Sequence, residues 1–315
     1  MTVLERPVSH PGGGSLLQER QKYFRVQPNL IKEHEENRRN KIPNKKNKGW
    51  SKKHANLKFA FWNPWSYSNE RHEYCKSLGY DVLGLGELHN MQDKQHYKGR
   101  RWVNSEVAKL DETGCSTDKA AGVAILLSNR AADKVLDKDS VGTRIAYVRL
   151  KGPMCNIFFI AAYIPHKGRT SAPFAEDTLQ ELKQLLDTVP AGDCVVLCGD
   201  FNCQLQRNVE GLTGKWAMTK RPDNGHGEKV LEMMRAYDLF AVDTLFKPRT
   251  RGRKGSRKVN NATYIPKDKA KRPTKLDYFL VSSRWKSMVI NSEVKWGAPM
   301  HRFGQQFDHG LLSVT

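Results

Sequence analysis

A series of short apolar runs, each followed by a turn or a polar residue, begins at Leu57 and continues to the end of the chain. Residues 194–197 (CVVL) form such a run, with the length and composition of a buried strand. Residues 174–188 have leucines at helical spacing instead. Because strand-like runs outnumber helical patterns and partly follow one another like hairpins, the order favours a layered α/β sandwich over a doubly wound parallel sheet.

The same pattern predicts one folded domain over residues 57–315, without an internal repeat. The expected strands cover residues 57–62, 82–85, 122–127, 145–150, 156–163, 194–198, 262–265, 276–282, 289–296 and 310–315. The expected helices cover residues 69–78, 174–188 and 228–237.

Basic charge is concentrated in two segments. The chain has 315 residues, with 53 Lys and Arg against 33 Asp and Glu and a net charge of +20. Residues 1–57 contain 13 basic and 5 acidic side chains, and residues 247–275 contain 12 basic side chains and one acidic. Because the remainder is nearly neutral, the two segments predict binding to a polyanion, with nucleic acid as the first candidate and an anionic membrane as the second.

The N-terminal segment, residues 1–56, is poor in apolar periodicity and rich in Pro, Gly, Asn, Lys and Arg. This composition predicts a disordered basic segment. The basic tract over residues 38–53 is interpreted as a nuclear-import signal or as an arm that binds nucleic acid, including RNA. A solubilising tail explains the same composition equally well.

Cysteine usage and hydropathy indicate the compartment. The six cysteines include no CxxC pair and no zinc-ligand spacing with histidine. Residues 1–20 contain no apolar stretch of signal-peptide length, and the longest apolar run, 157–164, is too short to span a bilayer. These features indicate a reducing compartment, cytosolic or nuclear, and a protein that is not secreted and does not contact a membrane. Together with the basic tract, they lead us to expect it in the nucleus, or in the cytoplasm before import. We further expect a monomeric domain.

Polar side chains recur at the expected strand termini. Each alone has an ordinary structural explanation, such as a turn residue before a proline or a surface carboxylate. Their recurrence in one chain predicts a shared site, because strands of one sheet that run in the same direction end at the same edge. We expect them at or just beyond the C-terminal ends of strands. They are Asn63, Glu87, Tyr163, Asp200, Asn202, Asp277, Asp308 and His309.

On these motifs the chain resembles the endonuclease/exonuclease/phosphatase superfamily, the fold of DNase I and of the apurinic/apyrimidinic endonucleases. The resemblance covers roughly residues 57–315 and implies a four-layered α/β sandwich of two mixed, mainly antiparallel sheets (DNase I-like). The matching strings are WN at 62–63, GE at 86–87, YIP at 163–165, GDFN at 199–202, LDYFL at 276–280 and DH at 308–309.

Residues 224–225 (NG) and 239–246 (LFAVDTLF) further resemble the endonuclease domain of LINE-type (non-LTR) retrotransposons. That resemblance implies a DNA endonuclease that nicks target DNA to prime reverse transcription. Three alternatives stay open: a cellular apurinic/apyrimidinic repair endonuclease, a lipid phosphodiesterase or phosphoinositide phosphatase of the same superfamily, and an inactive nucleic-acid-binding module.

The resemblance also implies roles for the site residues. Glu87 would hold Mg²⁺, or Mn²⁺ in its place, with Asn63 and Asp308 near its waters. The absence of a His/Cys cluster agrees with a hard ion that prefers oxygen ligands. The cation would neutralise the charge that develops when a phosphodiester is attacked.

The other residues would act on water and phosphate. Asp200 would accept a proton from the attacking water, and Asn202 would hold that water or a phosphate oxygen. His309, oriented by Asp277, would bind the scissile phosphate, and Tyr163 would donate a hydrogen bond to it. Whether Asp200 or His309 is the general base stays open at this level.

The basic segment before Asp277 is similar to a DNA-contacting hairpin of the retrotransposon domains. Such a hairpin would neutralise several phosphates of a bound duplex. The DNA-binding residues expected from the resemblance are Asn224, Thr263, Tyr264, Lys267, Lys269, Lys271 and Arg272.

Overall fold

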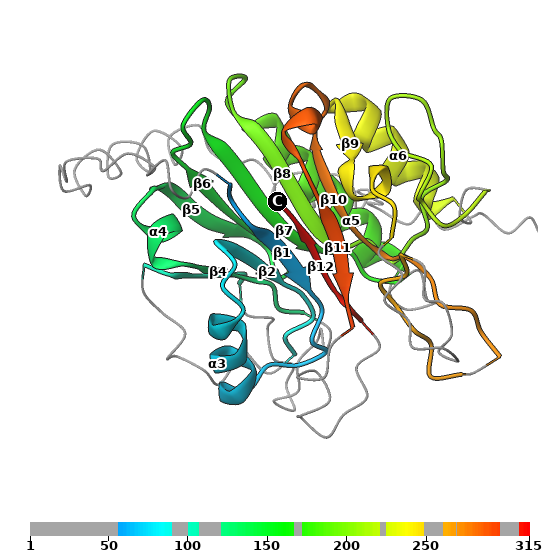
Figure 1. The fold of residues 1–315 in the computed structure, drawn as a ribbon, viewed down its shortest axis with the longest axis horizontal. Coiled ribbons are helices and arrows are strands. Elements are labelled where there is room, and N and C mark those ends of the chain that lie inside the picture. The colour runs from blue at the N-terminus through cyan, green and yellow to red at the C-terminus, as the bar shows by residue number, and fades with distance from the viewer. Residues whose placement is uncertain are drawn as a thin grey trace, which may run out of the picture. The chain divides into compact units, whose positions relative to one another are not determined.

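The computed structural model describes residues 56–89, 100–106, 121–166, 172–220, 225–248, 261–268, 270–296 and 309–315 (Figure 1). The expected basic segment, residues 1–56, lies outside this part of the chain except for its last residue. Three expected site residues also lie outside it: Asn224, Lys269 and Asp308.

The first sheet has six strands in the order β11-β12-β1-β2-β4-β3. β1 and β2 are parallel, and the other neighbours are antiparallel. The strands are β1 (Phe59–Trp62), β2 (Val82–Leu85), β3 (Trp102–Asn104), β4 (Ala124–Leu127), β11 (Ser292–Lys295) and β12 (Leu311–Val314).

The second sheet also has six strands, in the order β5-β6-β7-β8-β10-β9. β7 and β8 are parallel, and the other neighbours are antiparallel. Every residue of β8 is buried, as expected for a central strand covered on both faces. The strands are β5 (Val135–Val141), β6 (Ile145–Leu150), β7 (Ile157–Tyr163), β8 (Cys194–Asp200), β9 (Leu239–Ala241) and β10 (Asp277–Ser282).

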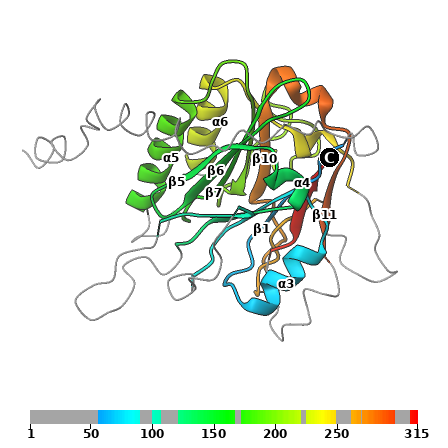
Figure 2. The ribbon, with the colours of Figure 1, turned by 90° about the vertical axis from the view of Figure 1, so that its left-hand side faces the viewer.

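Helices cover the outer faces of the two sheets (Figures 1 and 2). α3 (Asn69–Ser77) covers the first sheet, whereas α5 (Ala172–Asp187) and α6 (His226–Ala236) cover the second. The short helices are α4 (Asn129–Ala132), η3 (Val242–Leu245) and η4 (Ser283–Met288). The expected four-layered α/β sandwich of two mixed, mainly antiparallel sheets is therefore confirmed.

Local chemistry explains where the helices form. α3 begins after Ser68, whose hydroxyl accepts a hydrogen bond from the Arg71 N–H, and Gly79 follows it with φ +68°. In α5, the leucines at helical spacing are buried against the second sheet. Both helices had been expected, with boundaries that differ by one or two residues.

Some strands differ from the expectation. β3 is only three residues long, and β5 (VLDKDSV) is a partly exposed edge strand, so neither presents an apolar run. β9 forms from three residues that the pattern had not marked as a strand. The expected strand over 262–265 is instead a single bridging position at Tyr264, which pairs with Thr274 and with His309.

The inner faces of the two sheets form a common core, and glycines allow their close approach. A Cβ at Gly84 of β2 would lie 2.9 Å from the Cys198 Sγ of β8. Within the second sheet, a Cβ at Gly199 would lie 2.3 Å from the Ala162 carbonyl oxygen of β7. The glycine of the GDFN string is therefore required by the packing of β8 on β7.

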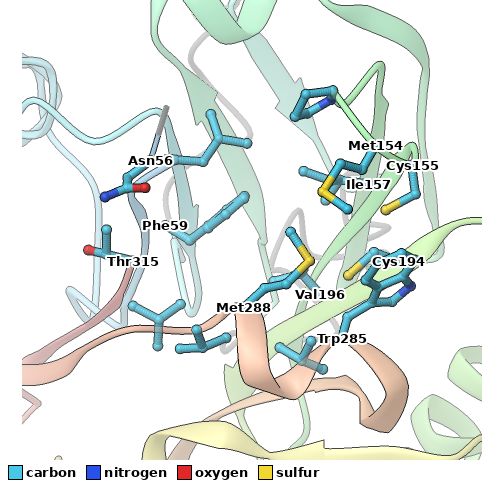
Figure 3. Close-up of a pocket in the computed structure, with 15 residues that line it drawn as sticks. Asn56, Phe59, Met154, Cys155, Ile157, Cys194, Val196, Trp285, Met288 and Thr315 are labelled. Atoms are coloured by element: carbon cyan, nitrogen blue, oxygen red, sulfur yellow. The ribbon is translucent and has the colours of Figure 1, made fainter. Parts of the chain in front are cut away.

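An apolar cavity of about 160 Å³ opens at the edge where β1, β7 and β8 begin. Phe59, Ile157 and Val196 contribute to its lining, with Trp285 and Met288 from η4 (Figure 3). Polar side chains are scarce around it, so it does not resemble a site for a charged phosphate ester.

The helices within the described ranges include none with the length and apolar character needed to cross a membrane.

Candidate active site

The described members of the expected catalytic set, all but Asp308, meet at one edge of the two sheets, opposite the edge that holds the cavity. Asn63 and Glu87 follow the parallel strands β1 and β2, which are paired up to Trp62 and Leu85. Tyr163 and Asp200 end the parallel strands β7 and β8 and are paired with each other.

Two residues reach this edge from strand starts, which corrects the expectation that all lie at C-terminal ends. Asp277 is the first residue of β10 and pairs with Asp200, because β10 is antiparallel to β8. His309 precedes β12, which is antiparallel to β1. An antiparallel strand begins where its neighbour ends, so these starts lie beside the ends of β1 and β8.

Asn63 connects the two sheets. Its Nδ2 donates to Glu87 Oε2 at 2.7 Å and to Asp200 Oδ2 at 3.0 Å. Its Oδ1 accepts from the Trp65 N–H at 3.0 Å. Because all of these contacts are short and Asn63 is buried, its amide holds the two carboxylates at a defined separation.

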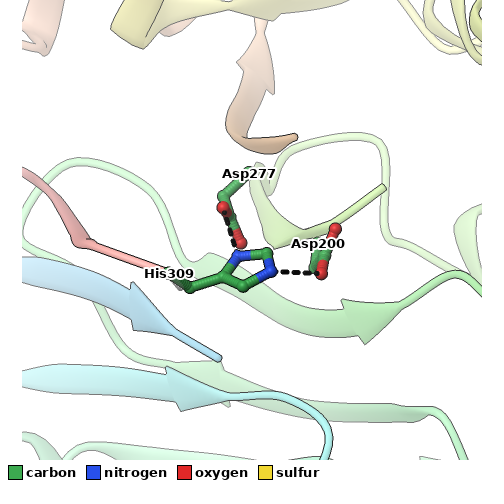
Figure 4. Close-up of side chains that lie close together, drawn as sticks. All are labelled: Asp200, Asp277 and His309. Atoms are coloured by element: carbon green, nitrogen blue, oxygen red, sulfur yellow. Dashed lines mark hydrogen bonds and ion pairs between the residues drawn. The ribbon is translucent and has the colours of Figure 1, made fainter. Parts of the chain in front are cut away.

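His309 lies between two buried aspartates (Figure 4). Its Nδ1 is 3.0 Å from Asp277 Oδ2, and its Nε2 is 3.6 Å from Asp200 Oδ2. With Nδ1 engaged by Asp277, the ring presents Nε2 toward Asp200.

Two carboxylates so close together raise the proton affinity of the site. Burial, and then the negative charge of Asp277, raise the pKa of Asp200 to about 7. His309 and the hydrogen bonds from Asn202 and Asn63 act in the opposite direction without offsetting the burial. Asp200 is therefore a stronger base than an exposed aspartate.

Thr263 and Gly310 hold Asp277 and His309 in place. The Thr263 Oγ1 accepts from the backbone N–H groups of Leu276 and Asp277, both at 3.0 Å. The Thr263 carbonyl accepts from the Gly310 N–H at 2.7 Å. A Cβ at Gly310 would lie 2.8 Å from the Trp296 ring, so only glycine fits beside His309.

The string at residues 239–246 does not line the site; it packs against β10, the strand that begins with Asp277. It forms β9 and η3, and the Asp243 Oδ1 accepts from the Phe279 N–H at 2.8 Å. Asp243 Oδ2 is 2.8 Å from Lys275 Nζ, and both side chains are fully buried. This ion pair fixes the chain two residues before Asp277.

Asn202 and Tyr163 lie beside the aspartates. The Asn202 N–H donates to Asp200 Oδ1 at 2.9 Å, and its Nδ2 donates to the Ile164 carbonyl at 2.9 Å. Asn202 therefore joins the loop after β8 to the loop after β7. Tyr163 is buried between the sheets, next to Gly86.

A hairpin over residues 264–274, here called the basic hairpin, lies beside the site. Backbone hydrogen bonds between Tyr264 and Thr274 close it, and Lys267, Lys271 and Arg272 are exposed on it. The Tyr264 ring lies 5.0 Å from the His309 ring. Thr263 is fully buried, so its side chain lies beneath any surface that DNA could contact.

Two residues near the site were not singled out in the sequence, Trp65 and His89. His89 Nε2 is 3.1 Å from Glu87 Oε1, and its ring packs edge-on against Trp65. Each lies two positions after an expected site residue. Their position, two residues after an expected site residue in a loop that follows a strand, was the one signal in the sequence that could have indicated them.

The donor set fits a hard divalent cation. Asp200, Asp277 and His309 each offer a ligand atom, and these atoms lie within 4.8 Å of one another. Asp277 Oδ1 is buried without a hydrogen-bond partner among the described residues. Glu87 adds a partly exposed carboxylate through its contact with Asn63. Carboxylate oxygens are the ligands that Mg²⁺ and Mn²⁺ prefer.

Comparison with known proteins identifies the family of the chain. A model of the Endonuclease/Exonuclease/phosphatase family matches residues 67–292. The chain is 24% identical over 241 residues to craniofacial development protein 2 of Bos taurus, covering 75% of this chain and 36% of that protein. It thus spans about a third of the length of that curated relative.

Three solved structures share the fold, each over 82% of this chain. The 3'-5' exonuclease NExo from Neisseria meningitidis has a TM-score of 0.55 at 17% identity, over 99% of its own chain. An AP endonuclease from Archaeoglobus fulgidus has a TM-score of 0.55 at 16% identity, also over 99%. The endonuclease domain of TRAS1, a telomere-specific non-LTR retrotransposon, has a TM-score of 0.50 at 11% identity, over 98%. With the family match over more than half of its length, this chain belongs to the Endonuclease/Exonuclease/phosphatase family.

Proposed function

We propose that this chain is a divalent-metal-dependent DNA endonuclease that nicks target DNA for retrotransposition by target-primed reverse transcription. The observation that carries the proposal is the buried group of Asp200, Asp277 and His309, joined to Glu87 through Asn63. A phosphodiester is a stable anion, and its cleavage needs a base, a group that stabilises added negative charge, and fixed geometry. The site provides all three.

Each residue has a defined task in the proposal. Asp200 takes the proton of the attacking water as its oxygen bonds to phosphorus and the ester bond on the opposite side breaks. His309, held by Asp277, directs Nε2 at the phosphate and stabilises the added charge. Tyr163 donates a hydrogen bond to the phosphate, and Asn202 keeps the Asp200 carboxylate oriented.

Of the groups that could hold a cation, the proposal assigns Mg²⁺ to Glu87, with Asn63 orienting that carboxylate and Asp308 as a further ligand. Asp200, Asp277 and His309 then remain available to act on water and phosphate. When bound, the cation supplies charge neutralisation at the phosphate and the leaving oxygen. Mn²⁺ has the same ligand preference and would substitute for it.

Charge supports DNA as the substrate. Lys267, Lys271 and Arg272 are exposed beside the site, and the segment 247–275 carries 12 basic side chains and one acidic. One solved structure of the same fold is a 3' phosphatase bound to a product DNA hairpin. The resemblance of residues 239–246 to LINE-type endonucleases supports the retroelement role. A nuclear location and a monomeric state belong to the same proposal.

Supercoiled plasmid tests the activity. With Mg²⁺, the wild type should convert it to the open-circular form, and EDTA should stop the reaction. Asp200→Ala and His309→Ala should lower the rate by about 10²–10⁴-fold, because each removes a group that acts on the reacting atoms. Asp139→Ala removes an exposed carboxylate on β5 and is the matched control. A plasmid that stays intact with the wild type, as it does with both site variants, would reject the proposal.

A second pair of substrates separates this function from its alternatives. The repair-endonuclease alternative predicts cleavage of a duplex with one abasic site and no nicking of intact plasmid. A phosphoinositide phosphatase would release phosphate from inositol phospholipid and leave both DNA substrates intact. Metal binding has its own readout: Mg²⁺ should raise the melting temperature of the wild type more than that of Glu87→Gln.

A further inference from the structure

An exposed indole lies directly beside the candidate site. Trp65, in the loop after β1, is 44% exposed, and it is the one exposed tryptophan in the part of the chain that the structure describes. The backbone N–H of Trp65 donates to the Oδ1 of Asn63, the residue that connects Glu87 and Asp200. The loop that positions Asn63 therefore also directs Trp65 to the surface.

The backbone is strained at two positions beside the site, one in the loop after β1 and one in the loop after β2. Trp65 has φ +55° and Glu87 has φ +53°. Among the described residues with positive φ, these two are neither Gly, Asn nor Asp, the types that tolerate this region best. Both lie at the candidate site, where such strain is characteristically maintained for function.

A cation accompanies the indole. Lys267 Nζ, from the basic hairpin, lies 4.3 Å from the centroid of the Trp65 ring. The centroid of the His89 ring lies 6.4 Å from that of Trp65, with an angle of 79° between the rings, and His89 Nε2 contacts Glu87. Proteins bind unpaired nucleotides with this combination: the aromatic ring stacks on the base, and the lysine binds the phosphate.

We propose that Trp65 stacks on an unpaired nucleobase next to the scissile phosphate, while Lys267 binds a neighbouring phosphate. The bases of a continuous duplex are stacked on each other, so only a single-stranded or extrahelical base can reach the ring. The preferred substrate is therefore DNA with an unstacked nucleotide at the cut. The link to cleavage rests on the proposed function, whereas the stacking contact itself requires no catalysis.

Binding without metal tests the contact. In EDTA, fluorescence anisotropy compares a short single-stranded oligonucleotide with an abasic oligomer of equal phosphate number. The wild type should bind the base-bearing oligomer about tenfold more tightly. Trp65→Ala should abolish this ratio, and Trp65→Phe should retain part of it.

Trp285→Ala is the matched control, because Trp285 also has a nearby cation, Arg284, but lines the cavity at the opposite edge. It should keep the wild-type ratio, and melting curves should show that all variants are folded. An unchanged ratio in folded Trp65→Ala would overturn the proposal.

Cleavage provides the second readout. With Mg²⁺, the wild type should cut a duplex with one unpaired nucleotide faster than the fully paired duplex, and Trp65→Ala should lose this preference. Cutting by the wild type without such a preference would overturn the role of Trp65 at the scissile phosphate. Failure to cut any DNA would reject the proposed function instead, and the binding ratio would still decide whether Trp65 stacks on bases.

Discussion

At the scale of single residues, the site places three ionisable side chains where solvent is largely excluded. Asp200 and Asp277 are 1% exposed and His309 is 6% exposed. Two carboxylates share one imidazole, so the site retains negative charge unless a proton or a cation compensates it. The raised pKa of Asp200 expresses this imbalance.

Asp200 should make stability depend on pH when metal is absent. Its pKa of about 7 in the folded protein is above the ordinary value of 3.8. The folded state therefore binds this proton more tightly, and the resulting stabilisation is complete below pH 3.8 and lost as the pH rises through about 7. Asp200→Asn, which has no charge to bury, should melt at a higher temperature than the wild type at about pH 8.

Differential scanning fluorimetry in EDTA measures this effect. The gain should be several degrees, since 1 kcal/mol shifts the melting temperature by roughly 2–4 °C in a domain of this size. It should shrink toward pH 4, whereas Asp139→Asn, at an exposed position, should show no such trend. A gain that is the same at pH 4 and pH 8 would contradict the electrostatic explanation.

At the scale of elements, the start of β10 is held from two sides. On one side, the Thr263 hydroxyl accepts from the backbone N–H groups of Leu276 and Asp277. On the other side, Asp243 of η3 binds the Phe279 N–H and forms the buried ion pair with Lys275. The string that resembles LINE endonucleases thus positions Asp277 without contacting the reacting atoms. Its role is to fix a carboxylate that His309 requires.

Thr263→Val tests this support with little change in side-chain shape. It removes the acceptor of two backbone N–H groups, and each unsatisfied donor costs about 1–3 kcal/mol. We expect about 2–5 kcal/mol lower stability in denaturant unfolding, together with slower nicking because Asp277 loses its fixed position. Thr263→Ser keeps the hydroxyl and should recover most of both. Equal losses in the two variants would show that the methyl group, not the hydroxyl, matters.

At the scale of the whole molecule, a nearly neutral body carries two basic segments. Affinity for DNA should therefore depend strongly on salt, because each lysine or arginine bound to a phosphate displaces a counterion. The two segments should contribute separately, since they lie far apart in the sequence.

Two variants measure these contributions. Replacing Lys267, Lys269, Lys271 and Arg272 by Gln should reduce the slope of log affinity against log salt by about 0.9 for each phosphate that is no longer paired with a cation. Removing residues 1–56 should also reduce the slope but leave the melting temperature and plasmid nicking unchanged, if the domain begins at residue 57. An unchanged slope would exclude the altered segment from the interface, and loss of folding after truncation would contradict the domain boundary.

Local patterns in the sequence predicted most of the architecture. β2 and β6 were expected with the boundaries they have, because each is an apolar run between turn residues. β5 was missed because its sequence, VLDKDSV, contains neither a continuous apolar run nor a regular alternation of apolar and polar residues. The site residues Asn63, Glu87 and Asp200 were predictable as polar residues that follow buried strands.

The sequence by itself determined the fold class, the polar residues of the site and the two basic segments, because periodicity, turn chemistry and charge are local properties of a chain. Only the tertiary structure decided that the starts of β10 and β12, with Asp277 and His309, lie beside the ends of β8 and β1, through antiparallel pairing. It also brought Lys267 onto Trp65 and buried Thr263 beneath Asp277. These contacts join residues distant in the sequence, and strand pairing across such distances leaves no periodic signal in the chain.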